Sequence, residues 1–147
     1  MSLAMSRAER EAFLAETHVG IVTVAEPDRG PLAVPIWYRY VPGGEVRFAT
    51  GETSRKTRLL RAAGRATLCV QTETPPYLYV TVEGPTTFDT VDFERDTREM
   101  AHRYLGRELG EAYLAALYGG TNTTSEVLVR LRPERWWTAD FRKFPLR

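Results

Sequence analysis

The sequence is poor in three residue types that often carry chemistry: cysteine, histidine and lysine. Its single cysteine, Cys69, excludes an internal disulfide and a cysteine-based metal cluster, and it favours a reducing, cytoplasmic environment. His18 and His102 lie far apart without metal-ligand spacing, so we expect no metal site. The only lysines are Lys56 and Lys143, against 18 arginines. This bias toward arginine makes each lysine a candidate for a specific role.

Long apolar runs and an excess of one charge are also missing. No stretch approaches the ~18 apolar residues of a membrane span, and no signal-peptide pattern is found. The 20 Lys plus Arg and 19 Asp plus Glu give a net charge of +1, so no overall field attracts nucleic acid or an anionic membrane. We therefore expect neither as a partner, and any anion must be held by a local site. Arginines interleaved with aromatics on a small barrel can also bind single-stranded nucleic acid. We rank this hypothesis below the two that are developed in the following paragraphs.

The elements expected from the apolar periodicity describe one α+β domain, mainly β, over residues 1–147. Met5 is a second methionine, so residues 1–4 are expected to be an artificial leader. Ser6 and Glu9 form a capping-box pattern at the start of a helix over 6–16, and a helical region over 92–118 is broken near 105–110. Strands are expected at 18–26, 32–41, 45–50, 65–72, 77–90, 125–133 and 135–141. Short hairpin-like turns join several of them, which favours a six- to seven-stranded antiparallel split β-barrel with peripheral helices.

Residues 47–60, "RFATGETSRKTRLL", place two cations where a helix should begin. If Thr53 or Ser54 is the N-cap, then Arg55 and Lys56 occupy the first turn, where free backbone amides already make the potential positive. Side chains that simply extend into solvent would lower this cost through screening. A bound phosphate would reverse it, because hydroxyls, amides and both cations would converge on one anion.

The segment "VRFATGETSRKTRLL" resembles the strand-to-helix segment of the flavin-binding pyridoxamine 5'-phosphate oxidase family, whose members carry a strand, a Thr, a short turn and Ser-Arg-Lys. The similarity extends to "GIVTVAEPDRGPLAVPIWYRYV", "YVTVEGP", the helical insertion and a Trp near the C-terminus. It implies an oxidoreductase that binds flavin mononucleotide (FMN) non-covalently in a split barrel and transfers hydride to or from a small-molecule substrate. It also implies a homodimer with cofactor sites at the interface.

The resemblance assigns cofactor-binding roles by position. Arg55 and Lys56 would hold the phosphate, with hydroxyl partners Thr50, Ser54 and Thr57. The "VPIWY" residues that would line the isoalloxazine ring are Val34, Pro35, Ile36 and Trp37. The ring carries the chemistry, so no catalytic side chain is assigned.

Several positions depart from the oxidase pattern. Val34 stands where the oxidase has a phosphate-binding Arg, Arg39 where it has a substrate-binding Lys, and Tyr79 where it has a flavin-contacting Gln. The Arg-x-His segment that grips pyridoxal phosphate is not found. Pyridoxamine phosphate is therefore not the expected substrate. The short, Trp-bearing chain looks more like actinobacterial branches that use FMN or the deazaflavin coenzyme F420.

The segment "RWWTADFRK" adds a further set of candidates. One indole, Trp136 or Trp137, would wall the flavin while the other fills the core, and we assign Trp137 to the cofactor. Arg142 or Lys143 could reach an anionic tail across a dimer interface. Cys69 is expected to be a buried, small apolar residue. A non-catalytic flavin or haem carrier of the same shape remains an alternative to an enzyme.

Overall fold

The computed structural model describes residues 2–145 and contains seven strands and four α-helices. In the part of the chain that it describes, no helix is long and apolar enough to cross a membrane. The helices are α1 (Arg7–Ala15), α2 (Arg55–Ala63), α3 (Glu99–Leu105) and α4 (Arg107–Tyr118), with a π-helical turn (Phe93–Arg98) before α3 and a 3-10 turn (Phe141–Lys143) after the last strand. The strands are β1 (Gly20–Val24), β2 (Leu32–Ile36), β3 (Val46–Gly51), β4 (Arg65–Gln71), β5 (Leu78–Thr90), β6 (Glu126–Leu131) and β7 (Arg135–Asp140).

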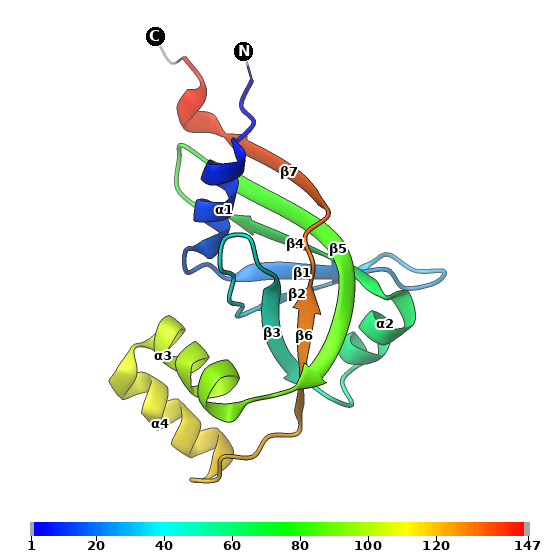
Figure 1. Cartoon of the computed structure of the whole chain (residues 1–147), viewed down its shortest axis with the longest axis vertical. Helices are drawn as coiled ribbons and strands as arrows, with labels where there is room; N and C mark the ends of the chain where they lie inside the picture. The colour runs from blue at the N-terminus through cyan, green and yellow to red at the C-terminus, as the bar shows by residue number, and fades with distance from the viewer. Residues whose placement is uncertain (1, 146–147) are drawn as a thin grey trace.

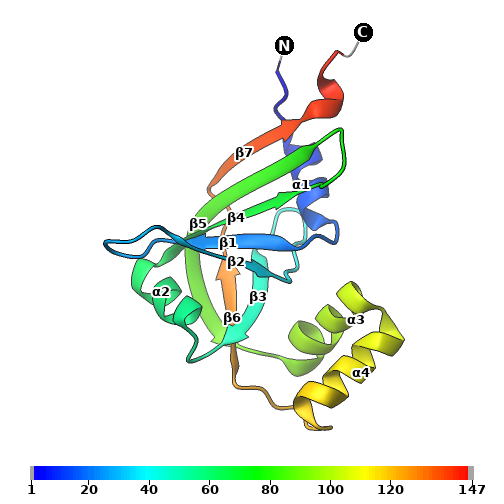
Figure 2. The same ribbon diagram turned by 180° about the vertical axis from the view of Figure 1, so that it is seen from behind.

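The strands form one curled antiparallel sheet in the order β2-β1-β4-β5-β6-β3, with β7 also paired to β5. This confirms the predicted antiparallel split barrel with peripheral helices. The long strand β5 is shared: its first part pairs with β4 and β7, and its last part, from Thr86, pairs with β6. Figure 1 shows β5 curving around the barrel, and Figure 2 shows the same curvature from behind. Pro35 lies in β2 at the edge of the sheet, where a proline removes no inner ladder bond.

The bend of β5 depends on Gly84. A Cβ atom at this position would lie 1.7 Å from the carbonyl oxygen of Arg132. The chain leaving β6 crosses β5 here, with hydrogen bonds from Arg132 N to Pro85 O (3.0 Å) and from Glu134 N to Glu83 O (2.9 Å). Only glycine lets the two backbones approach so closely.

Alternating inward side chains of the strands fill one core, together with the apolar face of α1. The capping box of α1 is confirmed, because Ser6 and Glu9 each accept a hydrogen bond from the other's backbone amide. Cys69 does not join this core and is only half buried. Neighbours Leu68 and Val70 point inward, so alternation along β4 turns Cys69 to the outer face, and the prediction of a buried cysteine was wrong.

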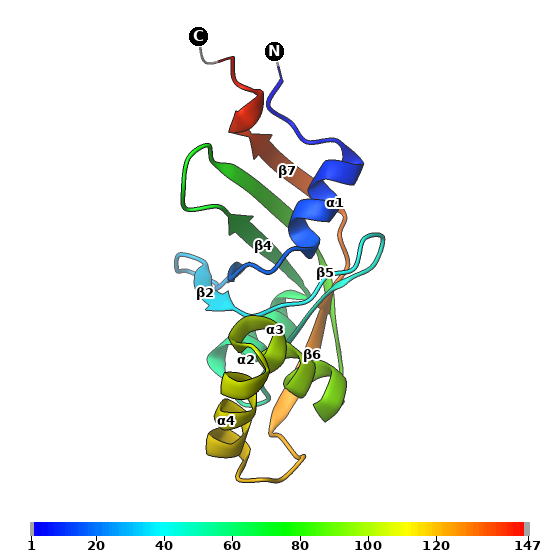
Figure 3. The ribbon, with the colours of Figure 1, turned by 90° about the vertical axis from the view of Figure 1, so that its left-hand side faces the viewer.

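The helices α3 and α4 form a hairpin that stands beside the lower half of the barrel, as Figure 3 shows. An aromatic stack attaches this hairpin to the segment after β2. The rings of Trp37 and Tyr104 lie 5.0 Å apart and are nearly parallel, at 5°. Tyr104 Oη also accepts a hydrogen bond from Tyr38 N (3.0 Å) and donates one to the carbonyl of His18 (2.6 Å). The predicted helical insertion is therefore fixed against the strand that was expected to line the ring.

One isolated bridge joins the two edges of the curled sheet. The backbones of Arg39, just beyond β2, and Arg47, in β3, exchange two hydrogen bonds of 2.9 Å each. β2 itself ends at Ile36, earlier than the predicted boundary at residue 41. The contact between the chain after β2 and the strand β3 is thus narrow.

Candidate functional site

The helix start predicted from the sequence is confirmed, with Ser54 as the N-cap of α2. Ser54 Oγ accepts the amide of Thr57 (3.2 Å), and Thr57 Oγ1 donates to the carbonyl of Gly51 (2.6 Å). Both hydroxyls therefore stabilise the turn from β3 into α2, and Thr57 is fully buried. The amides of Arg55 and Lys56 are first-turn donors without intrahelical acceptors, so the helix start can still offer backbone donors to an anion.

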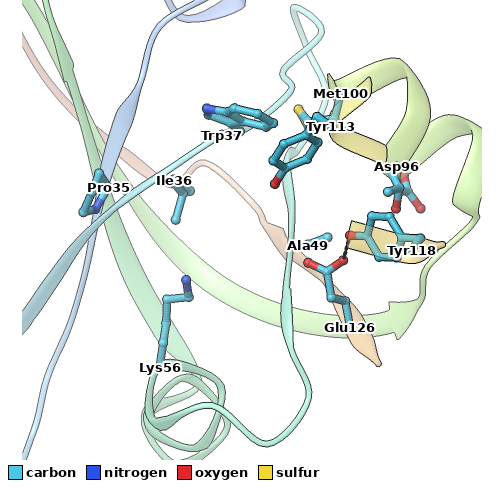
Figure 4. A pocket seen from close by; sticks show the side chains of 11 residues that line it. Pro35, Ile36, Trp37, Ala49, Lys56, Asp96, Met100, Tyr113, Tyr118 and Glu126 are labelled. Carbon is cyan, nitrogen blue, oxygen red and sulfur yellow. Dashed lines mark hydrogen bonds between the residues drawn. The ribbon is translucent and has the colours of Figure 1, made fainter. Parts of the chain in front are cut away.

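Lys56 lies at a cavity of about 220 Å³, which we call the Lys56 cavity. Figure 4 shows its amine extending from the start of α2 toward Pro35 and Ile36. Burial lowers the pKa of Lys56 from its ordinary value, and the nearby charge of Glu126 offsets only part of this effect. An amine held in a partly desolvated position is stabilised in its charged form by an anion. The residues lining the cavity are Pro35, Ile36, Trp37, Ala49, Lys56, Asp96, Thr97, Met100, Tyr113, Tyr118 and Glu126.

Arg55 does not turn toward this cavity. Its guanidinium pairs with Glu26, which lies in the β1–β2 turn, and its side chain is 45% exposed. The structure therefore separates the two cations that the sequence placed together: one is neutralised within the chain, and the other faces a cavity.

The remaining predicted residues divide between the cavity wall and other places. Pro35, Ile36 and Trp37 line the cavity as expected. Val34 instead packs against the core, and Thr50 is buried in β3. Trp137 lies on the outer face of β7 with 53% of its surface exposed, whereas Trp136 packs against the core and below Arg10. The structure thus brings Lys56 together with three residues of the predicted ring wall and leaves the other six candidates outside the cavity lining.

The two basic residues near the C-terminus have partners within the chain. Arg142 makes a two-pronged ion pair with Asp140, at 2.9 and 2.8 Å. Lys143 contacts Glu9 at 3.0 Å and the carbonyl of Ala4 at 2.9 Å, which ties the C-terminal turn to the segment around α1. In the described chain Lys143 therefore holds the two terminal segments together, and Arg142 is neutralised within the C-terminal segment.

The hairpin of α3 and α4 supplies cavity residues that sequence reasoning missed. Tyr113 packs on Trp37 with ring centroids 5.5 Å apart, and Figure 4 shows its hydroxyl pointing into the cavity. Tyr118 Oη donates to Glu126 Oε1 at 2.8 Å, and Thr124 donates to the same oxygen at 2.9 Å. Met100 and Tyr113 fall within the helical region expected over 92–118, for which the sequence predicted no role at a site. Their part in the cavity depends on how the hairpin docks, for which the sequence carries no local signal.

Acidic groups define the side of the cavity opposite Lys56. Burial, together with the hydrogen bond to Glu126, raises the pKa of Tyr118 far above its ordinary value. Burial also tends to raise the pKa of Asp96, but hydrogen bonds from Arg95 and from the amide of Asp92 outweigh it, so the net change is downward. Asp96 is therefore a carboxylate and Tyr118 a neutral hydroxyl near neutral pH. The cavity is positive at Lys56 and acidic at the hairpin.

Comparison with known proteins identifies the family. The model of the family described as pyridoxamine 5'-phosphate oxidase matches residues 6–140. The chain belongs to the pyridoxamine 5'-phosphate oxidase family, as the resemblance of its Ser-Arg-Lys segment predicted. A comparison with curated proteins found no match.

Solved structures share the fold at low sequence identity. A conserved hypothetical protein of Mycobacterium tuberculosis, Rv2991, has a TM-score of 0.78 at 23% identity, and the match covers 99% of this chain and 91% of that one. A structure named F420 reductase has a TM-score of 0.60 at 21% identity, with 86% and 94% covered. A FAD-binding protein of Mesorhizobium loti has a TM-score of 0.63 at 18% identity, with 90% and 92% covered. The family includes flavin- and F420-dependent oxidoreductases as well as members of unknown function.

Proposed function

We propose that the protein is an oxidoreductase that binds FMN non-covalently, with the phosphate at the start of α2 and the ring against Pro35, Ile36 and Trp37. The observation that carries the proposal is the position of Lys56, a partly desolvated cation beside free first-turn amides, at a cavity walled by the segment that the resemblance assigns to the ring. Family membership over residues 6–140 supports the same cofactor class.

The residues of this chain would bind and orient the cofactor, and the cofactor would carry out the chemistry. Lys56 and the amides of the helix start would bind the phosphate, while Trp37 and Tyr113, packed together at a tilt, would exclude water from one side. The flavin itself would supply hydride transfer when bound. Tyr113 also directs a hydroxyl into the cavity (Figure 4), where it could donate a hydrogen bond to a substrate. Pyridoxamine phosphate is not the proposed substrate, because Arg39 stands where the oxidase has a substrate-binding Lys and the sequence lacks the Arg-x-His segment that grips pyridoxal phosphate.

The size of the cavity supports a second chain at the site. Sites for small organic ligands are commonly about 300–1,000 Å³, whereas the Lys56 cavity is about 220 Å³. Pro35 lines this cavity and also begins a row of outward side chains that crosses five strands. Along the row the register pairs each residue with the next: Pro35, Ile21, Cys69, Thr81 and Trp137. We propose that a second copy covers this row and completes the cofactor site.

Substitution in the row tests the dimer. Trp137→Arg places a charge on the proposed interface, so it should convert the dimer to monomer and weaken FMN binding in parallel. Leu117→Arg, at an exposed apolar position of α4, is the matched control and should change neither property. Analytical ultracentrifugation and FMN titration measure the two effects. A wild-type chain that sediments as a monomer with FMN bound would contradict the shared site.

The cofactor is tested directly by titration of the cofactor-free protein. We expect FMN to bind with quenching of its fluorescence, and the bound ring to be reduced and reoxidised without dissociating. Coenzyme F420 in parallel is the informative comparison, because a solved structure named F420 reductase shares the fold. Tighter binding of F420 than of FMN would reassign the cofactor, and binding of neither would overturn the proposed function. A bound flavin that no acceptor oxidises would indicate a carrier.

A further inference from the structure

A second cavity lies next to the first and has a different chemical character. Its volume is about 380 Å³, and it shares Asp96 and Met100 with the Lys56 cavity. We call it the Arg47 cavity; its charged wall is formed by Arg39, Glu45, Arg47, Arg95, Asp96 and Glu99. The two cavities are therefore neighbouring compartments that share part of one wall.

The bridge between the sheet edges places two like charges in this cavity. Arg39 and Arg47 are direct partners across the isolated bridge, and both line the same cavity. Like charges directly opposite each other on paired strands are destabilising. Such a pair is tolerated where carboxylates or a ligand neutralise it. The partners of each guanidinium therefore show whether the chain itself neutralises both charges or leaves one for a ligand.

The carboxylates of the wall neutralise two of the three arginines. Arg39 pairs with Glu99 at 2.6 Å. Arg95 holds Asp96 through its Nε and Nη2 atoms, at 2.9 Å each. These two ion pairs use the carboxylates that lie on the hairpin side of the cavity.

Arg47 is the exception. Its Nε and Nη2 atoms are buried, and within residues 2–145 neither has a hydrogen-bond partner. Its charge does act at longer range on Asp96, whose pKa it helps to lower. Burial of charged donors without hydrogen bonds is costly, so a ligand oxygen that reached these two atoms from the cavity would be stabilised.

The free edge of Arg47 has the geometry of a carboxylate receptor. Nε and Nη2 are the same pair of donors that Arg95 presents to Asp96 and that Arg142 presents to Asp140. Two parallel N–H bonds match the two oxygens of one carboxylate. A phosphate dianion fits less well, because Glu45, Asp96 and Glu99 lie in the same wall.

We propose that Arg47 is the anchor of a substrate subsite that binds one carboxylate, so that the substrate of this oxidoreductase is a small organic acid. Its role as a substrate subsite rests on the proposed function, while the binding of a carboxylate does not. Because the two nitrogens are covered, a wall side chain must turn to admit the ligand. Met100, a flexible thioether, is one of the wall side chains and borders both cavities. This assignment differs from the resemblance, which points to Arg39, since Glu99 already neutralises that residue.

The subsite can be tested in the cofactor-free protein with benzoate, a planar carboxylate, and benzamide, its neutral analogue. In ¹⁵N-labelled protein, benzoate should shift the Nε–Hε resonance of Arg47 saturably, and benzamide should not. Arg47→Gln should weaken benzoate binding at least ~10-fold, the loss of a charged two-pronged contact. Arg47→Lys keeps the charge without the fork and should give an intermediate loss. Arg58→Gln, at an exposed position of α2, should bind benzoate like the wild type.

Several outcomes would overturn the subsite. They are no saturable benzoate shift at Arg47, equal shifts with benzamide, or wild-type benzoate affinity in Arg47→Gln. Inorganic phosphate is the competing probe. A change in the Nε–Hε chemical shift of Arg47 with phosphate but not with benzoate would reject a carboxylate ligand. If Arg47→Gln does not fold, the wild-type shifts and Arg47→Lys decide. FMN binding is measured in a separate titration. A wild-type protein that binds benzoate at Arg47 but does not bind FMN would reject the proposed function and keep the carboxylate subsite.

Discussion

Two places in this molecule bring like positive charges together: the start of α2, with Arg55 and Lys56, and the bridge between the sheet edges, with Arg39 and Arg47. In each pair a glutamate neutralises one member, Glu26 at Arg55 and Glu99 at Arg39. The other member lines a cavity. A repulsive pair therefore leaves one cation available at each place, and the two available cations face neighbouring compartments.

The two places differ in the donors around the available cation. Lys56 is a point charge beside free backbone amides of a helix start, which suits the several oxygens of a phosphate. Arg47 lies in a strand and offers a buried planar fork within a wall that also carries carboxylates. The difference teaches that the kind of cation and its backbone setting, more than the local charge count, distinguish a phosphate site from a carboxylate site.

The largest expected effect comes from breaking the scaffold that both places share. Gly84→Ala puts a Cβ atom against the backbone of Arg132, so the bend of β5 must shift. We expect the free energy of unfolding to fall by about 3 kcal/mol or more, measured by urea denaturation. Gly30→Ala, with nothing within 4 Å of the added atom, is the control. Equal stability of the two variants would show that the close approach is not rigid.

Removal of Lys56, the cation at the start of α2, should weaken the binding of FMN. Lys56→Ala loses a charge-assisted contact, so FMN affinity should fall by ~1.5 to 3 kcal/mol, about 10- to 150-fold. Fluorescence titration measures the change, with Arg58→Ala as the control on the same helix. Unchanged FMN affinity in Lys56→Ala would remove the phosphate assignment from the start of α2.

The pH dependence of FMN binding sharpens the contrast between an amine and a guanidinium. Burial places the pKa of Lys56 below its ordinary value of 10.5, and a phosphate stabilises only the protonated amine. FMN affinity should therefore fall as pH rises through the lowered pKa of the free protein, in a range where the phosphate is already a dianion, above about pH 7. In Lys56→Arg the affinity should stay flat, because the guanidinium remains charged. Parallel profiles in both proteins from about pH 7 up to 10.5, the ordinary pKa of a lysine, would reject this role for Lys56.

The smallest effect is expected at Arg55. Because its guanidinium is paired with Glu26 and partly exposed, Arg55→Ala should lower FMN affinity by less than about 1 kcal/mol. The same titration as for Lys56→Ala measures it. A loss as large as that of Lys56→Ala would mean that Arg55 leaves Glu26 when the cofactor binds, and the two cations would then act as an equal pair.

Much of the fold could be predicted because its signals are local. The N-cap at Ser54, the capping box of α1 and the alternation of the strands each depend on residues a few positions apart. The role of Lys56 was predicted from one short motif, and that of the ring-wall segment from the family resemblance around it. The sequence also predicted a hydroxyl role for Thr57 at the phosphate, but its side chain donates to Gly51 within the turn.

The rest of the site depends on contacts between distant segments. The pairing of Arg55 with Glu26 spans 29 residues, and the contact of Tyr104 with Tyr38 spans 66. None of these contacts has a spacing rule, so Tyr113, Tyr118, Glu126 and the free edge of Arg47 could not be assigned before the structure.

The strand β5 has a consequence for how the molecule comes apart. It contributes hydrogen bonds to β4, β6 and β7, so once this strand leaves, the β2-β1-β4 part of the sheet has no strand that connects it to β6 and β3. Heat or denaturant should then melt the barrel in one cooperative step, with its amides exchanging with solvent last along β5. Both cavities would lose their walls in that same step.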